Sequence, residues 1–311
     1  MVDAYEYVRL VKYSILQMTT GPSLLCDLFV FIYFLRNFRK EVVNSPQNHT
    51  ILCLLLISFI QKITDVPLLL YYLRWGYVLK ESYVFCQFWN WLDYSFCCIS
   101  AFLITLCSLQ RHLFIFHQQI MKKQGFLIIF HYIPLIVCLI YGPIFYFIVI
   151  FFPSQCENVW DYTLIFCSGA CYSYVPFLGT FDWLFHYGSP MFVILIVNLC
   201  LFFRVIEQKL QRRRIIDWRR QKRMIVQLAF ISILYFTFML PEIIVGVIEA
   251  LWDPTFLSDI QYYYFYYMAY FVNQFLPFII VGSLPNIHKQ FREWILFIKR
   301  TICLRGHIEP L

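Results

Sequence analysis

The sequence predicts an all-α membrane protein, a bundle of seven transmembrane helices followed by a C-terminal amphipathic helix. Composition is the first reason: 61% of the 311 residues are hydrophobic and 14% are charged, whereas a typical soluble domain has about 25% charged residues. Length is the second, because a helix needs about 20 apolar residues to cross a hydrocarbon core. Seven segments are long enough, and too continuous for the strands of a membrane barrel: residues 13–35, 50–73, 85–116, 126–152, 178–204, 224–250 and 258–283.

The distribution of basic residues predicts how the bundle is oriented. Of the 25 Lys and Arg residues, 20 follow the first, third, fifth and seventh segments, and cytoplasmic loops carry an excess of these residues. We therefore expect residues 1–12 to be extracellular, residues 13–283 to form the transmembrane domain, and residues 284–311 to be cytoplasmic, with the plasma membrane as the location. After position 284, apolar residues recur at helical spacing among basic ones, which predicts an amphipathic helix lying on membrane lipids.

The third segment carries functional groups at both ends. The 25 positions from Cys86 to Arg111 cover about 37 Å at ~1.5 Å per residue, so these two residues belong at opposite membrane faces. Asp93 and Arg111 are 18 residues apart, about five helical turns, and therefore point in the same direction. This spacing predicts an outer cavity at Asp93 and an inner one at Arg111.

Four of the 12 cysteines fall on the predicted outer side, where disulfides persist. Cys86 begins the third segment, and the other three lie in the loop after the fourth. Four cysteines allow three pairings, which sequence does not rank. We favour one bridge from Cys86 to the long outer loop and a second within that loop, among Cys156, Cys167 and Cys171.

Charged side chains also fall inside the predicted helices. Lys62 and Asp65 stand three residues apart, so we expect them to neutralise each other. Asp27 is expected to form a hydrogen bond between helices. Asp93 is costly in hydrocarbon unless it is paired, so it either marks a ligand site or forms an internal ion pair, with Lys62 as the candidate partner. Glu242 follows a proline and either lines the outer pocket or bonds a backbone group that the proline frees.

Taken together, the seven spans, their orientation, the third-span cysteine and the arginine 25 residues later resemble the rhodopsin-like (class A) G-protein-coupled receptors. The likeness extends over nearly the whole chain. Pro190, Pro241 and Pro277 are similar to the family's prolines in the fifth, sixth and seventh spans. Trp75-Gly76 resembles its aromatic-glycine motif in the first outer loop.

Several family motifs are altered, so the chain resembles a divergent branch of the family, of invertebrate type. Residues 110–112 read Gln-Arg-His where the family has Asp/Glu-Arg-Tyr. Residues 238–241 read Phe-Met-Leu-Pro instead of Cys-Trp-x-Pro, and residues 276–280 read Leu-Pro-Phe-Ile-Ile instead of Asn-Pro-x-x-Tyr. The prolines that shape the backbone are kept, whereas the polar switch residues are replaced.

The resemblance implies a receptor that binds an extracellular small-molecule or peptide ligand and activates a heterotrimeric G protein. Asp93 lies where amine-binding members hold a cationic ligand, and nearby aromatic rings would add cation–π contacts. Neutral Gln110 would restrain Arg111 less than the family's acid does, which implies raised signalling without ligand; the alternative is an arginine that simply ends a span. The expected ligand-binding residues are Asp93, Tyr94, Trp89, His186, Glu242, Tyr266 and Tyr270. The expected coupling and switch residues are Gln110, Arg111, His112, Met239, Pro241 and Pro277.

Other functions stay open on the sequence alone. A decoy receptor would bind ligand without signalling, which the altered motifs allow. The chain lacks enzyme motifs such as His-Glu-x-x-His, so we expect no enzyme activity, no cofactor, no metal site and no nucleic-acid partner. The basic run Arg212–Arg223 is expected to contact anionic lipid headgroups or the G protein. A transporter or channel is the main rival, with a charge relay through Asp27, Lys62, Asp65 and Asp93, although no inverted repeat supports it.

Overall fold

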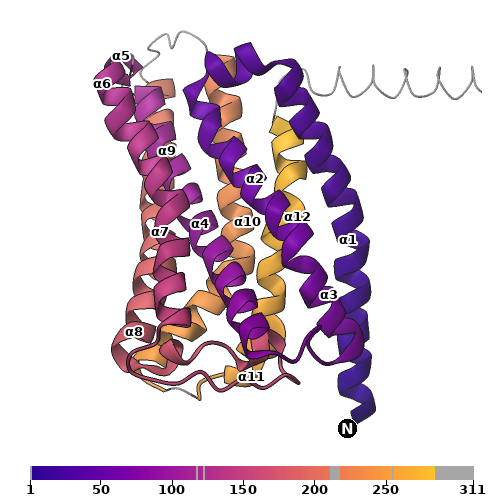
Figure 1. The fold of residues 1–311 in the computed structure, drawn as a ribbon. Helices are drawn as coiled ribbons and strands as arrows, with labels where there is room; N and C mark the ends of the chain where they lie inside the picture. The colour runs from indigo at the N-terminus through magenta and orange to yellow at the C-terminus, as the bar shows by residue number, and fades with distance from the viewer. Residues whose placement is uncertain (1, 117, 122, 211–217, 254, 284–311) are drawn as a thin grey trace, which may run out of the picture.

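The structure, a computed structural model, is a bundle of helices and describes residues 2–116, 118–121, 123–210, 218–253 and 255–283 (Figure 1). The expected C-terminal amphipathic helix and part of the basic run Arg212–Arg223 lie outside these residues. The described ranges contain no strand. Their main helices are α1 (Val2–Arg36), α2 (His49–Thr64), α3 (Val66–Trp75), α4 (Tyr83–Phe116), α5 (Gln118–Met121), α6 (Gln124–Leu127), α7 (Ile133–Phe151), α8 (Pro176–Phe181), α9 (Ser189–Leu210), α10 (Trp218–Leu251), α11 (Ser258–Ile260) and α12 (Tyr266–Ser283).

Short turns of π or 3₁₀ geometry complete these helices. Three π-helical turns extend spans at one end: η3 (Ile128–Tyr132) before α7, η6 (Asp182–Gly188) before α9 and η7 (Gln261–Phe265) before α12. The others lie in connections: η1 (Arg39–Val43), η2 (Pro46–Asn48), η4 (Ile165–Ser168) and η5 (Cys171–Tyr174).

The predicted number of membrane spans is confirmed. Seven helical stretches in the described part of the chain are long and apolar enough to cross a membrane. Because α1 already begins at Val2, most of the expected N-terminal segment continues the first helix. The spans are Tyr5–Arg36, Pro46–Trp75, Tyr83–Phe114, Gln124–Phe151, Pro176–Arg204, Ile225–Leu251 and Ser258–Ser283.

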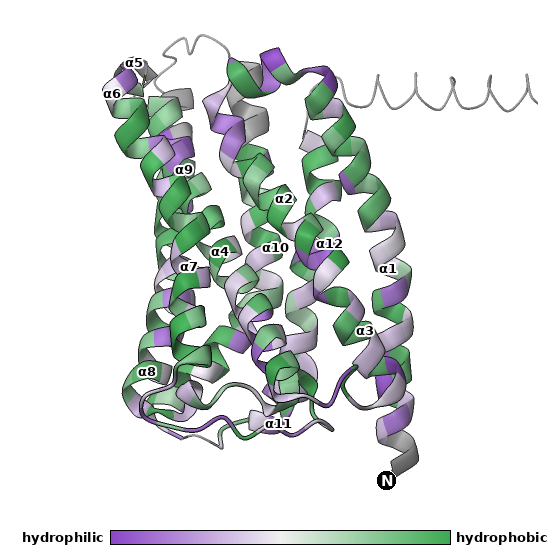
Figure 2. Ribbon diagram, viewed as in Figure 1, coloured by the Kyte–Doolittle hydropathy of each residue, from purple (hydrophilic) through white to green (hydrophobic). Residues whose placement is uncertain are grey.

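Most residues of the spans are hydrophobic (Figure 2), and many large apolar side chains are exposed on the surface of the bundle. Leu25, Phe203 and Ile233, for example, are exposed by 70%, 65% and 58%. Exposing apolar area to water costs roughly 25 cal/mol per Å², whereas lipid tails contact it without this cost. Together with the seven spans, this surface makes the chain a multi-pass membrane protein.

Helix α4 lies at the centre of the bundle. In its most apolar window 67% of the residues are buried, against 22% to 50% in the other six spans. It contacts α2, α7, α9 and α10. Gly142 of α7 permits one of these contacts, because a Cβ at that position would lie 3.0 Å from the Cys98 sulfur of α4. A small residue is the usual device for close helix packing in membranes.

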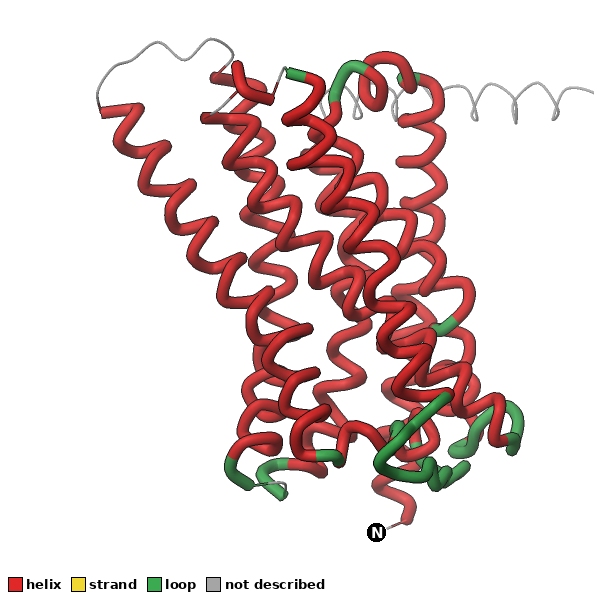
Figure 3. The backbone as a smooth tube through the Cα atoms, turned by 60° about the vertical axis from the view of Figure 1, so that its left-hand side comes forward, coloured by secondary structure: helices red, strands yellow, loops and turns green. Residues whose placement is uncertain are grey.

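The connections gather at the two ends of the bundle, as a second view direction shows (Figure 3). We call one end the disulfide end, because both disulfides lie there, and the other the arginine end, because α4 carries Arg111 toward it. Cys86 pairs with Cys167, and Cys156 pairs with Cys171. All four cysteines expected on the outer side are therefore bridged, and of the three possible pairings, each of which joins Cys86 to the loop, the structure has Cys86 with Cys167.

The backbone of this loop is strained beside the first disulfide. Phe166, Cys167 and Ser168 have φ angles of 52°, 53° and 78°, in the left-handed region that costs a non-glycine residue roughly 1–2 kcal/mol. The disulfide to Cys86 attaches this strained turn to the start of α4. As a result, Phe166 is held against the interior of the bundle, where its exposure is 5%.

The buried charges of α2 do not pair as predicted. Lys62 Nζ lies 2.6 Å from Asp27 Oδ2 of α1, and neither side chain is exposed. Asp65, at the break between α2 and α3, instead accepts a hydrogen bond of 2.8 Å from Trp89 Nε1 of α4. The predicted pair of Lys62 with Asp65 is therefore wrong, because the two side chains face different neighbouring helices. The alternative pair of Lys62 with Asp93 is also wrong, because Lys62 faces Asp27 of α1 whereas Asp93 faces Tyr270 of α12.

The ion pair makes a prediction about stability. Changing Lys62→Met alone leaves the Asp27 carboxylate buried without its partner, so the free energy of unfolding should fall by about 3–5 kcal/mol. Adding Asp27→Leu should restore much of the loss, because two apolar residues replace the pair. Thermal unfolding in lipid nanodiscs measures both variants. A double variant no more stable than the single one would show that the pair is not the cause.

Candidate functional site

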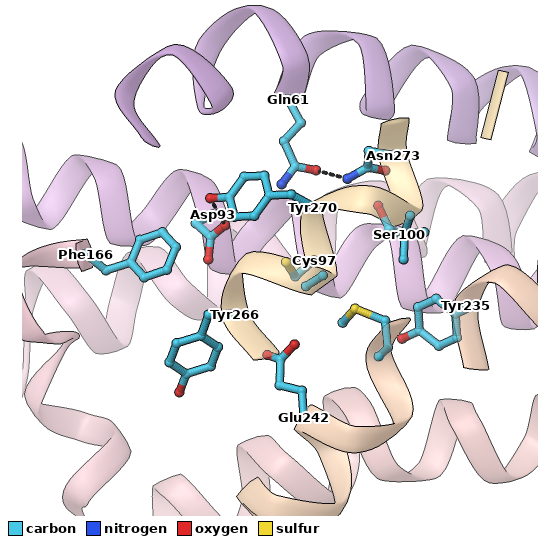
Figure 4. Close-up of a pocket in the computed structure, with 13 residues that line it drawn as sticks. Gln61, Asp93, Cys97, Ser100, Phe166, Tyr235, Glu242, Tyr266, Tyr270 and Asn273 are labelled. Atoms are coloured by element: carbon cyan, nitrogen blue, oxygen red, sulfur yellow. Dashed lines mark hydrogen bonds between the residues drawn. The ribbon is translucent and has the colours of Figure 1, made fainter. Parts of the chain in front are cut away.

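A small cavity lies inside the bundle, enclosed by α4, α10, α12 and the strained loop, and we call it the inner cavity (Figure 4). Its volume is about 40 Å³, whereas one water molecule needs roughly 10–15 Å³ measured in this way. It therefore has room for a few waters. Its lining residues are Gln61, Asp93, Cys97, Ser100, Phe166, Tyr235, Met239, Glu242, Tyr266, Ala269, Tyr270, Val272 and Asn273.

Helical periodicity brings these residues together. Positions three and four apart lie on one face of a helix, and each of the three helices uses such a face. In α4 the face carries Asp93, Cys97 and Ser100, and α10 contributes Tyr235, Met239 and Glu242. The face of α12 carries Tyr266, Ala269, Tyr270 and Asn273.

Two acidic side chains, Asp93 and Glu242, line the inner cavity, and none of its lining residues is basic. Asp93 Oδ1 accepts a hydrogen bond of 3.0 Å from the Tyr270 hydroxyl, whereas Glu242 Oε2 is buried without a hydrogen-bond partner. Asp93 also interacts electrostatically with Glu242 and with Asp65. Among the described residues, no Lys, Arg or His nitrogen lies within 4.0 Å of any of these three carboxylates. Two carboxyl groups of the inner cavity are thus without a basic partner among the described residues.

Neutral polar atoms around the carboxylates are also left unpaired. Ser100 Oγ and the Tyr235 hydroxyl are buried without partners, as is Asn273 Oδ1. The Asn273 amide nitrogen, by contrast, donates to Gln61 Oε1, which joins α12 to α2. Because buried polar atoms normally find a partner, this arrangement fits a cavity that receives water or a polar ligand.

The structure brings together four of the seven residues expected to bind ligand, namely Asp93, Glu242, Tyr266 and Tyr270. Their role in ligand binding stays a prediction. Sequence reasoning missed the rest of the lining. The 3.6-residue period would have found Cys97 and Ser100 from Asp93, whereas Phe166 reaches the cavity through a loop whose path no sequence pattern reveals.

The other three expected residues lie elsewhere, so placing them around Asp93 was wrong. The Trp89 ring is fully buried and is hydrogen-bonded to Asp65, as described above. Tyr94 points to the α7 side of α4, where its ring packs against Tyr146 and Tyr172.

His186 belongs to a separate hydrogen-bond cluster. Its Nδ1 lies 2.5 Å from Asp182 Oδ1, and its Nε2 lies 3.1 Å from the Tyr141 hydroxyl. Asp182 also accepts hydrogen bonds from the hydroxyls of Tyr146, at 2.7 Å, and Tyr172, at 2.9 Å. His186 and Asp182 both lie in the π-helical turn η6. A π-helical turn has more residues than a regular helical turn, so it changes the direction in which these side chains point. The cluster links span five to α7 and the loop.

At the arginine end, Arg111 is buried, with an exposure of 1%. Its Nη2 lies 3.5 Å from Gln227 Oε1 of α10, and its Nε and Nη1 have no hydrogen-bond partner. No carboxylate of the described residues lies within 4.0 Å of it. Gln110 faces away, because its Oε1 accepts a 2.6 Å hydrogen bond from Thr50. Between Arg111 and α10, the described residues thus provide one long hydrogen bond, to Gln227.

The remaining switch residues are distributed along the helices. His112 Nε2 lies 3.5 Å from an Arg204 nitrogen at the arginine end. Met239 lines the inner cavity. Pro241 and Pro277 lie inside α10 and α12, where each removes one backbone hydrogen bond. Both helices are therefore weakened within about a turn of the cavity lining.

The chain matches a known protein family. The family model described as 7 transmembrane receptor (rhodopsin family) matches residues 27–279. This range contains every residue of the inner cavity and the arginine contact to α10. No individual curated protein matches the chain.

The charge of the inner cavity can be measured at Cys97, which lines it, with fully buried Cys98 as an internal control. Methanethiosulfonate reagents need more space than the closed cavity offers, so they reach Cys97 only when the cavity opens. A cationic reagent should then modify Cys97 faster than an anionic one by at least about tenfold, because nearby carboxylates attract one and repel the other. Asp93→Asn should reduce this ratio. Peptide mass spectrometry reads out each cysteine separately. Equal rates for the two reagents at Cys97 would contradict a negatively charged cavity.

Proposed function

This chain belongs to the rhodopsin family of seven-transmembrane receptors, and from that premise we propose that it binds a cationic ligand in the inner cavity and activates a heterotrimeric G protein at the arginine end. Membership makes the chain a receptor and not an enzyme. The proposal of a cationic ligand rests on Asp93 and Glu242. These are two buried acidic side chains in one cavity, and no basic side chain of the described residues lies within 4.0 Å of them.

Two features support placing the disulfide end outside the cell and the arginine end in the cytoplasm. Disulfides persist in oxidising compartments, and both lie at the same end. The basic residues concentrate in the connections at the other end, as cytoplasmic loops do. We therefore propose that the ligand enters beside the disulfide-bonded loop, and that the plasma membrane is the location.

Ligand entry requires the inner cavity to open. An organic amine needs more space than about 40 Å³, because pockets for small organic ligands usually measure about 300–1,000 Å³. Phe166 and Tyr266 enclose the cavity, and their rings pack edge to face with centroids 6.2 Å apart. We propose that the ligand displaces these two rings, so that the described form is the closed one.

Helix α10 connects the inner cavity to the arginine end. A cation held between Asp93 and Glu242 would draw α10 toward α4 on one side of Pro241. Glu242 and Gln227 are 15 residues apart on α10, which is about 22 Å along the axis. Because the proline weakens the helix at this point, the far half of α10 can move and release Gln227 from Arg111. The freed guanidinium would then contact the G protein.

The cationic ligand makes the first functional prediction. Asp93→Asn should abolish the response to an amine agonist found in a panel of biogenic amines, because losing one partner of a buried charge pair costs about 2–5 kcal/mol. Glu242→Gln should weaken it too. Asp259→Asn, which removes an exposed acid near the disulfide end, is the matched control. Gα activation in cells reports potency, with surface expression measured alongside; unchanged potency in Asp93→Asn would end the cationic-ligand proposal.

The contact between Arg111 and Gln227 leads to a second functional prediction. Gln227→Glu should place a carboxylate on the arginine and lower ligand-free nucleotide exchange by about tenfold, since a charged hydrogen bond contributes roughly 1.5–3 kcal/mol. Gln227→Leu, which removes the contact, should raise it. Exchange on purified Gα measures both. If both variants leave ligand-free exchange unchanged, Gln227 does not restrain the receptor; if no Gα responds under any condition, the chain is a decoy.

A further inference from the structure

A second cavity lies at the disulfide end, between α1, the end of α3, the loop and the start of α12, and we call it the outer cavity. Its volume is about 270 Å³. It shares no lining residue with the inner cavity. Tyrosines form most of its wall, and Arg9 and Lys12 of α1 give it positive charge. The two cavities therefore differ in position, size and sign of charge.

Lys12 carries charge that the described structure does not neutralise. Its ammonium points into the bundle, where it donates a hydrogen bond to the Tyr263 carbonyl and lies 4.3 Å from the centre of the Tyr264 ring. An ammonium has three donors, and only this one hydrogen bond from it is observed among the described residues. No described carboxylate lies within 4.0 Å of it. A lysine that only reached for the membrane surface would point outward.

Arg9 has a structural role in the same cavity. Its Nη1 donates to the carbonyls of Tyr72, at 3.4 Å, and Leu73, at 3.1 Å, near the end of α3. Its Nη2 lies 3.6 Å from Glu6. Because these partners already hold the guanidinium, Lys12 is the group that remains able to bind an anion.

From this geometry we propose that the outer cavity is a second ligand site, which binds a small anion carrying an aromatic or apolar body. Lys12 binds the anionic group, and the tyrosine rings contact the body. A volume just below the roughly 300–1,000 Å³ of typical drug-sized pockets fits a carboxylate or phosphate with one ring or a short chain. The anionic group could belong to a free acid or to a lipid headgroup. This proposal does not depend on the cationic ligand of the inner cavity.

Binding of 3-phenylpropionate to the full chain in phosphatidylcholine nanodiscs tests the proposal, with neutral 3-phenylpropanol as the matched ligand. Saturation-transfer NMR should show the acid bound and the alcohol bound far more weakly. Lys12→Gln should lower the affinity for the acid by about tenfold or more, because a charged hydrogen bond is lost. Lys12→Arg, which keeps the charge, and Lys80→Gln, which removes an exposed lysine at the same end, should bind like the wild type.

A second arm distinguishes the two sources of the anion. Phosphatidic acid added to the nanodiscs should displace 3-phenylpropionate if the site accepts a lipid headgroup, and should leave it bound if the site takes only free acids. Native mass spectrometry then shows whether the lipid is retained by the wild type and lost from Lys12→Gln. Equal binding of the acid and the alcohol would overturn the proposal. So would binding of both 3-phenylpropionate and phosphatidic acid that Lys12→Gln leaves unchanged. Unfolding temperatures confirm that each variant is folded.

Discussion

A charge inside a bilayer must find a partner, and this constraint explains most of the bundle's interior. Lys62 and Asp27 satisfy each other between α2 and α1. Asp65 is not paired with a cation, but it receives hydrogen bonds from Trp89 and Gln61. These three charged groups join helices, and none of the three lines the inner cavity. Asp93 and Glu242 differ, because both face a cavity and neither has a described cation nearby. The same rule thus separates structural charges from candidate binding groups.

The loop attached by the Cys86–Cys167 disulfide forms part of both cavities. Two consecutive residues divide between them: Ile165 lines the outer cavity and Phe166 lines the inner one. Helix α12 repeats this division, with Tyr267 facing the outer cavity and Tyr266 the inner. The Tyr262 hydroxyl bonds the Ile165 carbonyl at 2.6 Å, which ties loop and helix together. Because Phe166 lies in a strained backbone conformation, displacing it from the inner cavity would relieve strain as well as break contacts.

Sequence alone predicted the features that depend on the membrane and missed those that depend on local helix geometry. Seven spans followed from length and hydropathy, since lipid contact requires long apolar segments. Which four cysteines share one side followed from the predicted topology, whereas which loop cysteine joins Cys86 came only from the structure. Lys62 was paired with Asp65 on the assumption of one continuous helix, but the span breaks at Asp65. His186 was expected near Asp93, but it lies in a π-helical turn and contacts Asp182 instead.

The opposite charges of the two cavities limit what each can accept. A cation approaching the disulfide end is repelled by Arg9 and Lys12 and attracted by Asp93 and Glu242, and an anion experiences the reverse. Neighbouring residues of the loop and of α12 face different cavities, so the charged groups that line each cavity help to sort the ligands. At an effective dielectric constant of about 20, one unit charge contributes roughly 4 kcal/mol at 4 Å. A single wrong-sign contact of that size would outweigh the packing of a small aromatic ring, so neither cavity can substitute for the other.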